Sequence, residues 1–181
     1  LKLIRALQPD AKTIGIVYTV SEPNSVSAIA EYEAKCGDYG FEVKPIGVTA
    51  QSEVTQAIDT LLGEQVDCFS NLTDNTVVGV LGAILEKTDE AGIPVYGSEI
   101  EQVINGCMAS VSIDYVALGR ATADMGIRVL GGESAGTIPV GKISDGTAVV
   151  NTEVMDKFGI TLPDSYADAE KVTSADKEDA E

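Results

Sequence analysis

Histidine and tryptophan are both absent from this sequence. Without histidine, the chain lacks the commonest general base and the commonest protein metal ligand. Its three cysteines are Cys36, Cys68 and Cys107, and no two of them have the CxxC spacing. Such a set predicts neither a disulfide framework nor a zinc site. We therefore expect no metal and no cofactor.

Basic residues are scarce as well. Twelve Lys and Arg stand against 29 Asp and Glu, which gives a formal net charge of −17 at pH 7. Because recognition of nucleic acid needs clustered basic side chains, this balance argues against a nucleic-acid partner. No apolar run approaches the roughly 18 residues of a membrane span. The 181 residues suit one domain with a substantial core.

The chain opens at Leu1 without a methionine, in a segment that already has a helical pattern over residues 1–7. We expect a fragment or a processed chain for this reason. The lack of a targeting segment then carries little information about where the protein resides.

Short apolar runs alternate with longer segments of helical period along most of the chain. The predicted strands are Ile14–Tyr18, Glu42–Val48, Val66–Ser70, Ile93–Tyr96 and Ala109–Ile113. The predicted helices cover residues 24–38, 52–63, 75–91, 99–105 and 115–130. This alternation with short joints predicts an α/β fold of the flavodoxin-like kind. We expect a doubly wound parallel sheet of five or six strands with helices on both faces.

The pattern changes after Gly131. Residues 138–140 and 147–151 predict short strands, and Glu153–Phe158 predicts a short helix. From Asp164 onward the sequence is acidic and poor in large apolar residues, which predicts a flexible tail. The predicted organisation is a lobe over residues 1–135, a returning segment over 136–163 and a tail over 164–181.

Polar side chains follow the predicted strands at the edge where open parallel sheets bind ligands. The residues concerned are Asn24 and Ser25 after the first strand, Thr73, Asp74, Asn75 and Thr76 after the third, Ser98 and Glu99 after the fourth, and Asp114 after the fifth. Ser, Thr, Asp and Asn are also the preferred helix caps, and Ser98 with Glu101 reads as a capping box. Capping explains Ser98 fully but only one residue of the third set. The surplus predicts a site for a small polar ligand.

An enzyme is the competing interpretation. The sequence contains no GxSxG, P-loop, HExxH or GxGxxG motif. A self-contained small α/β enzyme or regulatory domain that uses the carboxylate of Asp74 or Asp114 stays open. A receiver-type phosphoacceptor domain is excluded, because it needs an acidic pair after the first strand, where this chain has Tyr18-Thr19-Val20.

Six motifs occur together in a fixed order. They are Asn24-Ser25, Thr73-Asp74-Asn75-Thr76-Val77, Pro94-Val95-Tyr96-Gly97-Ser98-Glu99, Asp114-Tyr115-x-x-Leu118-Gly119, Ile138-Pro139-Val140 and Val149-Val150-Asn151. In this order and spacing they resemble the ABC-transporter substrate-binding proteins of the tryptophan/tyrosine-binding type. The resemblance covers residues 1–160. Each motif is modest alone, but six in register are specific.

The resemblance implies a type I periplasmic binding protein fold, in which two α/β lobes joined by a hinge close over a ligand. This chain resembles the second lobe with its return towards the hinge and the first lobe, and the first lobe is missing. A membrane permease and its ATPase are the implied transport partners. The implied location is extracytoplasmic, either periplasmic or anchored to the membrane as a lipoprotein. No catalytic activity is implied.

The implied ligand is an amino acid or a similar small molecule. The positions to test for contact are Asn24, Ser25, Thr73, Asp74, Asn75, Glu99 and Asp114. The ligand's ammonium group would pair with Asp74, which we rank first, or with Asp114, and its carboxylate would meet hydroxyls, amides and helix N–H groups. Two departures bear on the ligand's side chain, since Leu72 stands where the family has proline and Ser112 where it often has glycine.

Overall fold

Four parallel strands form the larger sheet. The computed structural model describes residues 1–143 and 146–174 of the chain. The strands are β1 (Thr13–Thr19), β2 (Glu42–Val48), β3 (Cys68–Ser70) and β4 (Val95–Tyr96), in the spatial order β2-β1-β3-β4. All four coincide with predicted strands, although β3 and β4 are shorter than expected. The parallel order confirms the predicted α/β class.

A second sheet continues the first. It contains β5 (Ala109–Ile113), β6 (Gly146–Asn151) and β7 (Glu170–Val172). Two backbone hydrogen bonds link it to β4: Met108 N–H donates to Val95 O at 2.7 Å, and Gly97 N–H donates to Ala109 O at 2.9 Å. β6 runs antiparallel to β5, and β7 runs parallel to β6. The parallel ladder therefore has four strands instead of the expected five or six. β6 returns from the end at which β5 leaves, so it must run in the opposite direction.

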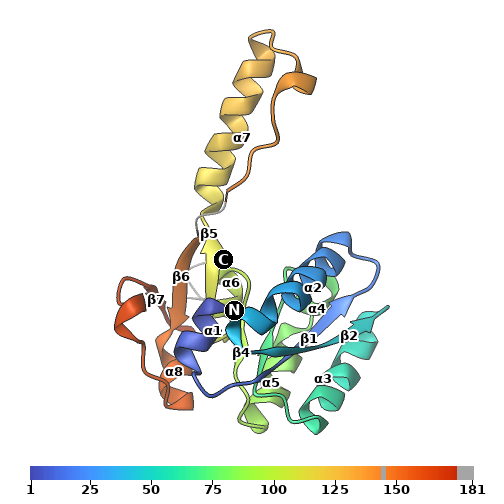
Figure 1. Cartoon of the computed structure of the whole chain (residues 1–181), viewed down its shortest axis with the longest axis vertical. Helices are drawn as coiled ribbons and strands as arrows, with labels where there is room; N and C mark the ends of the chain where they lie inside the picture. The colour runs from blue at the N-terminus through green and yellow to red at the C-terminus, as the bar shows by residue number, and fades with distance from the viewer. Residues whose placement is uncertain (144–145, 175–181) are drawn as a thin grey trace.

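Helices cover both faces of the larger sheet (Figure 1). They are α1 (Lys2–Leu7), α2 (Pro23–Lys35), α3 (Val54–Gly63), α4 (Asn75–Val78), α5 (Leu81–Glu90), α6 (Ile100–Ile104), α7 (Tyr115–Leu130) and α8 (Thr152–Phe158). Short 3-10 turns lie at Cys36–Tyr39, Gln51–Glu53, Ala135–Thr137 and Asp164–Tyr166. None of the helices in the described residues is both long enough and apolar enough to cross a membrane.

The period of two along β1 builds the two halves of the core. Ile14 and Ile16 face a cluster that includes side chains of α1, α2 and α8. Val17 faces the other cluster, with side chains of α3 and α5. Both isoleucines are fully buried. The sheet is thus covered on both sides, as the sequence predicts.

Two predicted elements differ in the structure. The expected helix over 75–91 is divided into α4 and α5, and Gly79 closes α4. A side chain at Gly79 would meet the side-chain nitrogen of Gln51 at 2.6 Å, so glycine permits this close approach. Residues 138–140 form no strand, because their backbone pairs with no other strand in the described part of the chain. Residues 135–137 before them form a 3-10 turn.

The described part of the predicted flexible tail, residues 164–174, contains regular structure. Residues 164–166 form a 3-10 turn, and β7 pairs with β6. Val172 is buried beside Val103 and Val149, while Tyr166 packs against the main cluster. The apolar side chains scattered through this acidic segment are sufficient to anchor it. The last part of the predicted tail, residues 175–181, lies outside the described residues.

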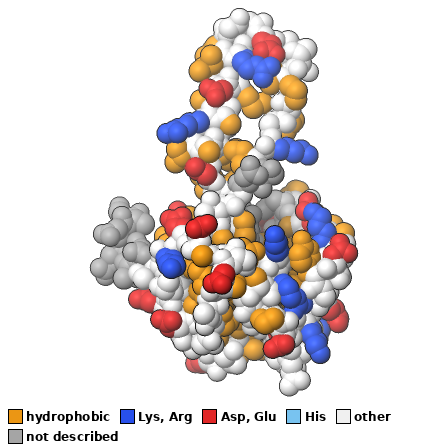
Figure 2. Space-filling view, turned by 60° about the vertical axis from the view of Figure 1, so that its left-hand side comes forward, with side chains coloured by type: hydrophobic (Ala, Val, Ile, Leu, Met, Phe, Trp, Pro, Cys, Tyr) orange, Lys and Arg blue, Asp and Glu red, His pale blue; other side chains and the backbone are white. Residues whose placement is uncertain are grey.

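α7 and the segment after it, residues 115–143, form an arm that projects away from the body (Figure 1). α7 has no buried residue, and Val116, Ile127 and Leu130 are 64%, 65% and 88% exposed. Hydrophobic side chains are visible along this arm in Figure 2. By contrast, Val150 and Met155 of the returning chain lie in the main core cluster. The structure therefore sets residues 115–143 apart as an arm, and the division at residue 136 stays a prediction.

The arm makes a prediction about local stability. A helix of this length without tertiary packing is marginal in water. We therefore expect the amides of α7 to exchange with deuterium about 100-fold faster than those of β1, which lies in the core. Hydrogen exchange of the isolated chain, followed by mass spectrometry at a concentration where it is monomeric, measures this ratio. Equal protection of α7 and β1 would show that α7 has a stable packing partner within the chain.

Candidate functional site

The loops after β1 and β3 are joined by the carboxylate of Asp74. Its Oδ2 accepts from the Thr19 N–H and the Ser25 hydroxyl, both at 2.7 Å. Its Oδ1 accepts from the Thr19 hydroxyl at 2.7 Å and from the Val77 N–H at 3.0 Å. The side chain is fully buried and caps α4. Burial acts to raise the pKa of Asp74, but these hydrogen bonds together hold it below its ordinary value.

A second carboxylate, that of Glu22, joins the same two loops. Its Oε2 accepts from the backbone and side-chain nitrogens of Asn75 at 3.2 and 3.1 Å. Its Oε1 accepts from the Thr76 N–H at 3.4 Å. Asn24 also bridges these loops, since its Nδ2 donates to Thr73 O at 2.9 Å. The first N–H groups of α4 are therefore already bound by the protein's own carboxylates.

The loop after β4 is held to the loop after β3 by a buried amide. Gln102 is 1% exposed, and its Oε1 accepts from Asn71 Nδ2 at 3.1 Å and from the Ser98 N–H at 3.2 Å. Its Nε2 donates to Leu72 O at 3.2 Å. The Ser98 hydroxyl donates to Asn71 O at 2.6 Å. The side chain of Gln102 thus makes hydrogen bonds to three polar groups on these two loops.

Two predicted carboxylates begin helices at this edge. Glu99 accepts from the Gln102 N–H at 3.1 Å and the Glu101 N–H at 3.2 Å, and burial raises its pKa. Asp114 is exposed, and its Oδ1 accepts from the N–H groups of Val116 and Ala117 at 2.8 and 2.9 Å. Oδ2 of Asp114 receives no hydrogen bond from the described residues, so it is open to a further donor.

The structure brings five of the seven predicted positions into one hydrogen-bonded group: Asn24, Ser25, Thr73, Asp74 and Asn75. Glu99 is placed next to this group, because its neighbour Ser98 binds the loop after β3. Asp114 stands apart at the base of the arm, and its hydrogen bonds go to α7 itself. The expected capping box at Ser98 is not formed. Glu99 is the cap, and the Ser98 hydroxyl bonds to Asn71 instead.

Three contributors to this edge are missing from the predicted set: Thr19, Glu22 and Gln102. Glu22 lies in a polar loop beside Pro23, but its partners are 53 and 54 residues away in the sequence. Gln102 occupies a core position, so neither exposure nor periodicity marks it. The sequence feature that could have identified Gln102 is its long polar side chain within the apolar face of a helix. That pattern requires an internal partner when the position is buried.

A small hollow lies beside this network. It encloses about 180 Å³ between α1 and the ends of β3, β4 and β5, and its polar lining includes Tyr32, Ser70, Ser98 and Ser110. Complete small-molecule pockets usually enclose about 300–1,000 Å³. Within the described residues no group of three or more Cys, Asp or Glu is placed to hold a metal ion. The edge therefore offers polar contacts and one wall of a pocket.

The parallel sheet, the helices on both faces and the polar network beyond one edge define a lobe of the type I periplasmic binding protein class. Its fold is similar to that of the ABC domain crystallised in complex with L-Trp from Streptococcus pneumonia. The TM-score is 0.85, with 33% identity and coverage of 94% of this chain. A ligand-free, open substrate-binding protein with adhesive properties from Clostridium difficile gives a TM-score of 0.75, with 33% identity over 96% of this chain.

The sequence comparisons agree with the fold. The family described as ABC transporter substrate binding protein matches residues 1–173. A tyrosine-binding protein of Clostridioides difficile (strain R20291) is 35% identical over 158 residues, which are 86% of this chain. The chain belongs to the family of ABC transporter substrate-binding proteins, and the resemblance to the tryptophan/tyrosine-binding type is confirmed. It spans 45% of the tyrosine-binding protein and 58% of each of the two solved structures, about half of their length.

The network around Asp74 predicts a pH-dependent contribution to stability. Asp74→Asn replaces an acceptor oxygen by an N–H donor that faces other donors, so we expect the free energy of unfolding at pH 7 to fall by about 2 kcal/mol. Because the folded-state pKa is depressed, the wild-type contribution is present above the unfolded pKa of about 3.9 and is lost as pH falls through the folded pKa. Urea unfolding at pH 7 and pH 3 should therefore show a smaller difference between the two proteins at pH 3.

The matched control is Asp38→Asn. Asp38 is exposed, and its side chain makes no hydrogen bond within the described residues. We expect its substitution to leave stability unchanged at both pH values. Equal behaviour of the Asp74 and Asp38 variants would contradict the structural role of Asp74.

Proposed function

We propose that this chain is the second, ligand-binding lobe of an extracytoplasmic ABC-transporter solute-binding protein. It captures a small amino-acid-like ligand, and the two relatives named for tyrosine and L-Trp favour an aromatic one. The observation that carries the proposal is the network of Asn24, Thr73 and Asn75 beyond the ends of β1 and β3. It is exposed on one side and has no second wall within this lobe.

The polar ends of the ligand have different partners in this proposal. Thr73 and Asn75 are exposed and present a hydroxyl and an amide to its carboxylate. Asp74 was ranked first for the ammonium group from the sequence, but its burial and four internal donors leave it no free oxygen. The role passes to Asp114, whose Oδ2 is free among the described residues. Asp74 and Ser25 then act by holding the loops in place.

The arm supports a two-lobed parent. An apolar helix surface in water is unfavourable, and exposed patches of this kind mark sites that another surface covers. We propose that α7 packs against the first lobe, so that this lobe and the missing one share the arm. Closure of the two lobes would bury the ligand between them.

The transport partners in this proposal are a membrane permease and its ATPase. Substrate-binding proteins of this family are extracytoplasmic components of transporters and not enzymes. We propose that this chain likewise catalyses no reaction, and that its parent is anchored as a lipoprotein. In support, Asp74, one of the two carboxylates that an enzyme could use, has no access to solvent.

A single lobe of a two-lobed binding protein should bind the ligand weakly. This lobe alone offers one wall, so we expect a Kd for tyrosine or tryptophan near the millimolar range, against micromolar or tighter for the two-lobed protein. The difference is about 4 kcal/mol. Calorimetry of the isolated chain measures it. Submicromolar binding of either amino acid to this chain alone would overturn the two-lobe proposal.

The ammonium partner can be tested in the two-lobed protein. Asp114→Asn keeps an acceptor for the cap of α7 but removes the charge, and truncating a buried charge pair weakens binding by about 2–4 kcal/mol. We therefore expect amino-acid affinity to fall by about 30-fold or more, with little change in melting temperature.

Asp124→Asn is the control for this experiment. Asp124 is an exposed residue of the same helix, and its loss removes the same charge. We expect this variant to bind as the wild type does. If Asp114→Asn also retains full affinity, Asp114 is not the ammonium partner, and Glu99 is the next carboxylate to test.

A further inference from the structure

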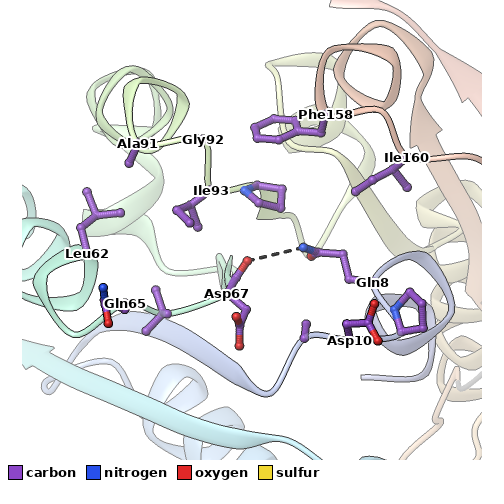
Figure 3. A pocket seen from close by; sticks show the side chains of 14 residues that line it. Gln8, Asp10, Leu62, Gln65, Asp67, Ala91, Gly92, Ile93, Phe158 and Ile160 are labelled. Atoms are coloured by element: carbon purple, nitrogen blue, oxygen red, sulfur yellow. Dashed lines mark hydrogen bonds between the residues drawn. The ribbon is translucent and has the colours of Figure 1, made fainter.

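A second and larger hollow lies at the opposite edge of the sheet (Figure 3). It encloses about 670 Å³, within the range of small-molecule pockets. Ala11, Asp67 and Pro94 line it, and they stand just before β1, β3 and β4. The seven residues of β1 separate this amino edge from the polar edge by about 20 Å. The amino-edge pocket is thus distinct from the proposed amino-acid site.

One side of the amino-edge pocket is apolar. Phe158 and Ile160 come from the end of α8 and the residues after it, and Ile93 and Pro94 come from the turn before β4. Leu62, near the end of α3, closes this side. Figure 3 shows Leu62 at the left, Ile93 near the centre, and Phe158 and Ile160 at the upper right. The wall suits an aromatic ring or a short alkyl chain.

The other side is polar and includes two acidic residues. Gln8, Asp10, Gln65 and Asp67 line it, and none of the lining residues that the structure gives is basic. The ends of α3 and α5 also reach this edge, because the pocket is lined by the residues that follow each helix. Helix C-termini carry partial negative charge. The carboxylates and the helix C-termini therefore both favour a positively charged ligand.

Asp67 is fixed in its charged form. Its Oδ2 accepts from the N–H groups of Lys12 and Thr13 and from the Thr13 hydroxyl, each at 2.8 Å. Burial acts to raise the pKa of Asp67, but the hydrogen bonds lower it by more. The pKa therefore lies below its ordinary value. Its Oδ1 receives no hydrogen bond from the described residues. One oxygen of this lining residue's carboxylate is therefore without a donor among the described residues, while the other is fixed in place.

We propose that the amino-edge pocket binds a small primary amine that carries an apolar group. The ammonium donates to Asp67, within the field of Asp10 and of the helix ends, and the apolar group lies against Phe158, Ile93 and Ile160. A carboxylate-bearing molecule is disfavoured, because two acidic side chains would repel it. The expected selectivity is opposite to that of a site for an amino-acid carboxylate.

The test uses phenethylamine and 3-phenylpropionate, which are similar in size and opposite in charge. Each is titrated into the ¹⁵N-labelled chain and followed by NMR. We expect phenethylamine to shift the amides of residues 8, 10, 11, 65–67 and 91–93 saturably, and 3-phenylpropionate to leave them unchanged. Shifts confined to residues 19–22, 24, 25 and 71–76 would place the amine at the other edge and overturn the proposal. Equal binding of both probes would overturn it as well.

Variants decide whether the carboxylates carry the binding. Asp67→Asn removes the partner charge but also affects the turn before β1, so Asp10→Lys is the second variant. Asp10 is exposed, and its side chain makes no hydrogen bond within the described residues. Its reversal should leave the fold intact and weaken phenethylamine binding about threefold or more. Asp124→Lys, on the distant arm, makes the same change in net charge and should have no effect. Equal affinities of the Asp10→Lys and Asp124→Lys variants would refute the proposal.

Discussion

The carboxylate of Asp74 is the group on which the carboxyl edge of the sheet depends. Its hydrogen bonds connect the end of β1, the first turn of α2 and the start of α4. Charge-assisted hydrogen bonds are stronger than neutral ones, and the buried setting strengthens them further. The outer contacts, such as that of Asn24 with Thr73, are exposed and individually weak. They keep their geometry because the buried carboxylate fixes both loops beneath them.

The two edges of the sheet present opposite ends of the helices and therefore opposite partial charges. At the carboxyl edge, helices begin, and Glu22, Asp74, Glu99 and Asp114 bind their first N–H groups. At the amino edge, helices end, and their carbonyl groups face outward. Parallel β-α alternation imposes this polarity on the lobe. In a protein with a net charge of −17, the acidic caps at the carboxyl edge are placed where the partial positive charge of the helix N-termini favours them.

The alternation of apolar runs and helical segments was sufficient to predict the strands β1 to β5 and the gathering of polar side chains at the carboxyl edge of the sheet. Cap preferences also predicted that one residue of the set at 73–76 caps the helix, and Asp74 is that residue. These patterns could not show that Asp74 is buried, because the donors on Thr19 and Ser25 are 55 and 49 residues away. Glu22 and Gln102 were missed for the same reason. The direction of β6 depends on the arm, which has no signature within the strand itself.

The arm is attached to the body at two points, and this has a mechanical consequence. β5 leads directly into α7, and the chain comes back beside it to enter β6, which is hydrogen-bonded along β5. Two adjacent strands joined by a ladder bend more readily across their plane than they shear or rotate within it. A load placed on the arm is therefore converted into tilting about a single axis, while rotation of the arm about its own length is resisted.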